Sequence, residues 1–105
     1  MPKFVLIYHG KPDCEGPEES ARHMTAWNAW RDGMGAAVVD PGVAVGPSKT
    51  ITAIAILEDG GANPTSGVTI IQADTMEAAI SLAQSCPHLS GTGTIEIAQA
   101  LDMEM

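Results

Sequence analysis

The chain has few cations, few cysteines and no long apolar run. Of its 105 residues 5 are Lys or Arg, against 13 Asp or Glu, and the formal net charge is -8. Nucleic acids and anionic membranes need clustered cations, so we expect neither as a partner. No apolar run approaches the roughly 18 residues of a membrane span, and the N-terminus lacks a secretory signal pattern. Two cysteines without a CxxC motif form a poor disulfide framework. We therefore expect a cytoplasmic protein with reduced thiols.

The composition and length of the chain are typical of a small folded domain. Hydrophobic residues make up 45% of the chain and charged residues 17%. The length corresponds to one domain, residues 1–105. A chain this short has a small core, so it gains much from a partner subunit.

The apolar pattern predicts a mixed α and β fold. Five segments have the composition of strands: residues 3–9, 36–46, 50–57, 67–73 and 94–98. The second is broken by the turn Asp40-Pro41-Gly42. Helices are expected at residues 17–34 and 74–84, the latter with Asp74 as N-cap.

Five strand segments are one more than the order β-α-β-β-α-β contains, but the chain otherwise follows that order. It predicts a ferredoxin-like α+β domain, with a four-stranded antiparallel sheet and both helices on one face. The other face would carry Val, Ile and Thr side chains into water. A single domain rarely exposes an apolar patch above roughly a few hundred Å². We therefore expect a homodimer that packs sheet face against sheet face.

The first predicted helix carries a candidate acid/base residue. His23, Trp27, Trp30 and Met34 follow one another at the spacing of a helical stripe. An unperturbed imidazole titrates near neutral pH and can give or take a proton, while the two tryptophans would wall an apolar pocket. The alternative is a half-buried core histidine beside a tryptophan pair that belongs to the core or to a protein interface.

Asp40 is the expected partner of His23, because a carboxylate can orient an imidazole and stabilise its charged form. Asp32 is the alternative, but it lies about 180° around the helix from His23. An aspartate before Pro-Gly is also a common turn residue whose side chain caps its own backbone.

Metal, nucleotide and thiol sites are not indicated. The HxxxH, HExxH, GxGxxG and GxxxxGK[ST] motifs are missing, so we expect no metal and no cofactor. Cys86 beyond a helix end and Cys14 in an acidic loop are poorly placed to form thiolates. His88 is expected in a surface loop that at most reaches the pocket rim. The net charge favours a cationic or neutral ligand, although Arg22 offers local positive charge.

The order and spacing of several segments resemble the YCII-related family, whose members are dimeric α+β barrels of ferredoxin-like units. The matching segments are residues 3–8 (KFVLIY), 23–27 (HMTAW), 40–42 (DPG), 66–71 (SGVTII), 74–83, 86–89 (CPHL) and 94–97 (TIEI). A related branch carries Asp-Gly-Pro-Phe after the third strand, where this chain has Asp59-Gly60 followed by Gly61-Ala62. The resemblance implies a first-helix histidine with an aspartate nearby in a cleft.

These observations favour an enzyme that needs no cofactor. His23 and Asp40 would act as an acid/base pair on a small organic molecule, in a pocket shaped by Tyr8, Trp27, Trp30 and His88. The alternative is a non-catalytic ligand-binding or regulatory module with the same dimeric barrel. A third hypothesis is that the tryptophan stripe contacts a different protein.

Overall fold

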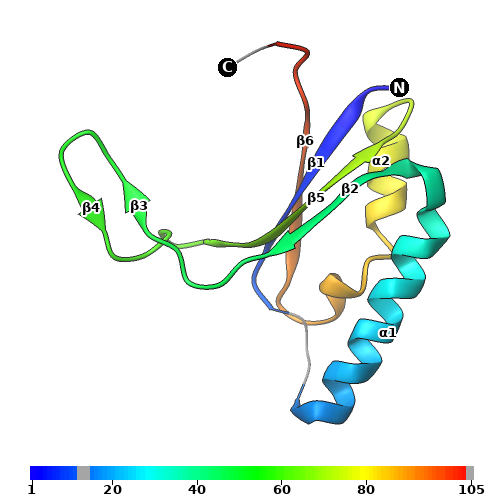
Figure 1. The fold of residues 1–105 in the computed structure, drawn as a ribbon, viewed down its shortest axis with the longest axis horizontal. Helices are drawn as coiled ribbons and strands as arrows, with labels where there is room; N and C mark the ends of the chain where they lie inside the picture. Colours follow the sequence, from blue (N-terminus) through cyan, green and yellow to red (C-terminus); the bar gives the residue numbers. More distant parts are fainter. Residues whose placement is uncertain (12–14, 104–105) are drawn as a thin grey trace.

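A four-stranded antiparallel sheet with both helices on one face forms the body of the protein (Figure 1). The computed structural model describes residues 1–11 and 15–103, so the prediction about Cys14 lies outside the described residues. The strands follow the order β2-β5-β1-β6. Their bounds are β1 Lys3–His9, β2 Val38–Ala44, β5 Thr65–Gln72 and β6 Thr94–Gln99, and the helices are α1 Gly16–Met34 and α2 Met76–Ala83. The prediction of an α+β domain with a four-stranded antiparallel sheet and two helices is confirmed, and this arrangement is consistent with a ferredoxin-like fold.

Strand β1 lies at the centre of the sheet because it pairs antiparallel with β5 on one side and β6 on the other. Its side chains alternate between the two faces, as in any strand. Phe4, Leu6 and Tyr8 are buried on the face that the helices cover, while Val5 and Ile7 are half-buried on the other. The core therefore lies between the sheet and the helices.

The sheet face opposite the helices, here called the open face, is apolar at its centre. Val5 pairs with Ile70 and Ile7 pairs with Val68, so these four side chains share that face. All four are half-buried, because no described helix covers them (Figure 1).

The predicted strand at residues 50–57 is wrong. Two short strands, β3 (Thr50–Ile51) and β4 (Ile56–Leu57), form a separate hairpin that extends away from the main sheet (Figure 1). Thr52 makes the turn, because its Oγ1 accepts hydrogen bonds from the backbone N–H groups of Ile54 at 3.3 Å and Ala55 at 2.9 Å. Such local side-chain bonds compete with extended pairing, which β-branched composition alone does not reveal.

Helix α2 begins later than predicted, at Met76, and its N-cap is Thr75 rather than Asp74. The Thr75 hydroxyl accepts a hydrogen bond from the backbone N–H of Ala78 at 3.1 Å. Either residue type is a good N-cap, so the sequence alone did not separate them.

The two helices pack differently on the sheet. Helix α2 buries Ala79 and Ala83, whereas α1 has no buried residue. Trp30 joins the helices, since its indole Nε1–H donates to the carbonyl oxygen of Leu82 at 2.8 Å. None of the helices within the described ranges has the length and apolar character needed to cross a membrane.

Candidate functional site

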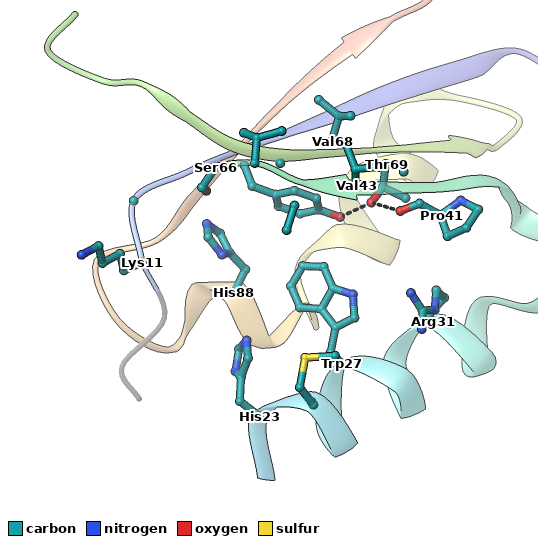
Figure 2. Close-up of a pocket in the computed structure, with 17 residues that line it drawn as sticks. Lys11, His23, Trp27, Arg31, Pro41, Val43, Ser66, Val68, Thr69 and His88 are labelled. Carbon is teal, nitrogen blue, oxygen red and sulfur yellow. Dashed lines mark hydrogen bonds between the residues drawn. The ribbon is translucent and has the colours of Figure 1, made fainter. Parts of the chain in front are cut away.

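A cavity of about 500 Å³ lies between α1 and the sheet (Figure 2). Helix α1 supplies His23, Met24, Trp27 and Arg31 to one wall. The remaining lining comes from the strands and their loops and from one 3₁₀ turn: Tyr8, Gly10, Lys11, residues 41–45, residues 66–69 and His88. The loose packing of α1 leaves this space beside the core.

Four rings from three segments form one wall of the cavity, the ring cluster of Tyr8, His23, Trp27 and His88. The Tyr8 ring centroid lies 5.2 Å from that of Trp27 and 5.2 Å from that of His88. His23 lies 5.9 Å from Trp27, and Trp27 lies 6.3 Å from His88. The edge-to-face contacts of Tyr8, Trp27 and His88 are favourable for aromatic rings and fix these rings along the cavity wall.

The Tyr8 hydroxyl is fixed by a chain of hydrogen bonds. It donates to Thr69 Oγ1 at 2.8 Å, and Thr69 donates in turn to the carbonyl oxygen of Pro41 at 3.1 Å. Burial raises the pKa of Tyr8 to about 12, although the hydrogen bond to Thr69 acts in the opposite direction. The phenol therefore stays neutral, and its oxygen can only accept a further hydrogen bond.

His88 lies inside the protein, which corrects the expected surface loop. It is 5% exposed and belongs to the 3₁₀ turn Pro87–Ser90. Its Nε2 lies 2.8 Å from the carbonyl oxygen of His9. A carbonyl only accepts, so Nε2 carries the hydrogen and Nδ1 is left to bind a proton or a ligand. Gly93 permits this placement, because a Cβ there would overlap the carbonyl oxygen of His88.

His23 lines the cavity as predicted, but Asp40 does not. Asp40 is exposed, and its Oδ1 accepts a hydrogen bond from the backbone N–H of Gly42 at 2.8 Å. This is the turn role that the sequence left as the alternative. Asp32 is exposed on α1 and does not line the cavity either. Among the described residues, no hydrogen bond or ion pair joins His23 to either carboxylate, so the acid/base pair stays a prediction.

Trp27 and Trp30 have different surroundings. Both pack against the core and their ring centroids lie 5.4 Å apart, but only Trp27 lines the cavity. At about 100° per residue, positions 24, 27 and 31 turn toward the cavity while positions 30 and 34 turn toward the core. Arg31 follows Trp27 by four residues, a spacing that places both on one side of a helix, and sequence reasoning missed it.

His9 lies outside the cavity and has both ring nitrogens next to acceptors. Nε2 is 3.1 Å from Glu96 Oε1, and Nδ1 is 3.2 Å from the carbonyl oxygen of Pro64. The hydrogen bond to Glu96, outweighing partial desolvation, raises the pKa of His9 above its ordinary value of 6.5. The protonated imidazole therefore ties β1 to β6 and to the loop before β5.

Glu96→Gln is expected to lower the pKa of His9. Because that pKa is raised by folding, the stabilisation is complete below the unfolded value of 6.5 and is lost as the pH rises through the folded pKa. The variant should thus destabilise the protein at about pH 5.5 and have little effect at about pH 8.5. Histidine NMR titration and urea unfolding measure this, with Glu58→Gln as the control. An unchanged His9 pKa would contradict the assignment.

The described residues offer neither a metal cluster nor a reactive thiol. No group of three His, Cys, Asp or Glu side chains among residues 1–11 and 15–103 is arranged to hold a metal ion. Burial raises the pKa of the Cys86 thiol to about 11, so it remains protonated at neutral pH.

Comparison with known proteins adds no identification. No protein-family model matches the chain, and no curated protein matches it significantly.

Proposed function

We propose that this protein binds a small organic molecule in the cavity between α1 and the sheet. The ring cluster supports this most directly, because it lines the cavity with four mutually packed rings beside a few polar groups. The volume of about 500 Å³ lies within the range of ligand pockets, roughly 300–1,000 Å³. The hydrogen-bonded Tyr8 and His88 fix the orientation of the polar groups.

The two tryptophans supply an internal control for this function. We expect titration with a neutral flat compound, such as indole, quinoline or 2-naphthol, to shift the indole N–H signal of Trp27. The Trp30 signal should move less, because Trp30 lies outside the lining with its N–H bound to Leu82, although its ring centroid is 5.4 Å from that of Trp27. Trp27→Ala should abolish binding while Trp30→Phe retains it. Equal shifts at both tryptophans, or none at about 1 mM, would contradict the proposal.

A second candidate is acid/base catalysis in the same cavity. His88 favours it, because its bond to His9 leaves Nδ1 for proton transfer, and no described group hydrogen-bonds that atom. His23 supplies a second imidazole without needing Asp40. Exchange of ligand C–H for deuterium in D2O would test this, with His88→Gln and His23→Gln compared. If neither variant slows the exchange, the catalytic proposal fails, whereas the proposal that the cavity binds a small molecule is unaffected.

The oligomer and the family are also proposals. A second copy covering the open face would form the dimeric barrel, and the half-buried Val5, Ile7, Val68 and Ile70 support it. The sheet order and the helix pair are compatible with membership of the YCII-related family.

A further inference from the structure

The lining of the cavity has a charge opposite to that of the whole chain. The chain carries 13 acidic residues and 5 Lys or Arg. None of the acidic residues that the structure describes lines the cavity, whereas Lys11 and Arg31 do, together with two imidazoles. Figure 2 places Lys11 and Arg31 on opposite sides of the ring cluster. The lining therefore favours an anionic ligand over the cationic or neutral ligand expected from the net charge.

The Arg31 guanidinium keeps its charge available. Its Nη2 donates to the neutral amide oxygen of Asn28 at 2.6 Å, and no carboxylate in the described part of the chain lies within ion-pair distance. Lys49, by contrast, lies 2.7 Å from Glu58. Arg31 is half-buried, so water screens its charge less than that of an exposed cation.

The neighbouring polar group adds no competing negative charge. Tyr8 lines the same cavity and remains a neutral phenol, because burial raises its pKa. The cavity lining also contains apolar and aromatic side chains, among them Met24, Trp27 and Val43. Aromatic rings in the lining favour a ligand with a flat apolar body, and Arg31 lies to one side of the ring cluster (Figure 2).

We propose that the ligand of this cavity is a small carboxylate with a flat apolar body, whose carboxylate is bound by Arg31. The planar fork of a guanidinium matches a carboxylate in shape, and the charge-assisted pair is stronger than a neutral hydrogen bond. This inference rests on the proposed function of the cavity and specifies the class of its ligand.

Three 2-substituted naphthalenes that differ in the charge of the substituent test the proposal: 2-naphthoate, 2-naphthamide and 2-naphthylmethylammonium. Their dissociation constants follow from the shift of the Trp27 indole N–H signal, with Trp30 as the internal control. We expect 2-naphthoate to bind at least about tenfold more tightly than the other two. Arg31→Gln should remove that preference and leave weak, similar binding of the carboxylate and the amide.

Arg22→Gln is the matched control, because it removes the same charge from an exposed position of the same helix outside the lining. It should retain the preference for 2-naphthoate. Equal binding of all three compounds by the unmodified protein would overturn the carboxylate proposal and leave the binding site standing. A preference that survives Arg31→Gln would also overturn it. If none of the compounds shifts the Trp27 signal, this proposal and the proposed function both fail.

Discussion

Gly42→Ala is expected to prevent folding or to lower the free energy of unfolding by about 3 kcal/mol or more. Gly42 lies in β2 with φ at 75°, in a region of backbone conformation that residues other than glycine rarely adopt. A Cβ at this position would overlap the carbonyl oxygen of Val68 in the paired strand. Relief requires β2 to move away from β5, which would also open one wall of the cavity. Urea unfolding followed by circular dichroism measures the loss.

Gly46→Ala is the control for this prediction. Gly46 follows β2 closely, and a Cβ there would meet no atom within 4 Å. The backbone of Gly46 is also outside the left-handed region. The control should change stability by less than about 1 kcal/mol. Similar losses in both variants would show that the contact between Gly42 and Val68 is not what limits stability.

Ile7→Lys is expected to convert a dimer into monomers. Ile7 is half-buried at the centre of the open face, opposite Val68 of the neighbouring strand. A charge placed between two such faces loses its hydration without gaining a partner, a cost of several kcal/mol. The dissociation constant of the dimer should rise by at least about a hundredfold. Light scattering after size exclusion should change from twice the chain mass of 10.9 kDa to that mass.

Ala29→Lys is the matched control for the dimer, because it adds the same charge at an exposed position of α1. It should leave the dimer intact. An unmodified protein that is monomeric at about 100 µM would contradict the proposed dimer. A dimer that survives Ile7→Lys would place the interface elsewhere on the molecule.

Much of the fold could be predicted from local patterns. The apolar run in residues 3–9 and the helical spacing in residues 17–34 identify β1 and α1, because both patterns depend only on neighbouring residues. The hairpin at residues 50–57 could not be predicted this way. Its β-branched residues favour a strand, but the Thr52 side chain bonds the backbone and closes a turn. A contact of this kind depends on the geometry of a few atoms rather than on composition.

The candidate site likewise combines residues that local spacing predicts with residues that only long-range contacts place. The helix places His23 and Trp27 on one wall, and the same wall contains Arg31, which sequence reasoning did not single out. The burial of His88 depends on a carbonyl of β1 and on Gly93, which are distant in the sequence or outside any periodic pattern. The sequence around Asp40 fits both a catalytic partner and a turn, so it could not decide between them. In the structure the Asp40 carboxylate accepts a hydrogen bond from the backbone N–H of Gly42, which is the turn role.

A crystal structure of the protein soaked with 2-naphthoate would show directly whether the cavity beneath α1 holds a small molecule against the ring cluster. We expect density for the ring system beside Trp27, with the carboxylate at the Arg31 guanidinium. An empty cavity, or one filled by side chains of a second copy with the naphthoate bound elsewhere, would contradict this expectation.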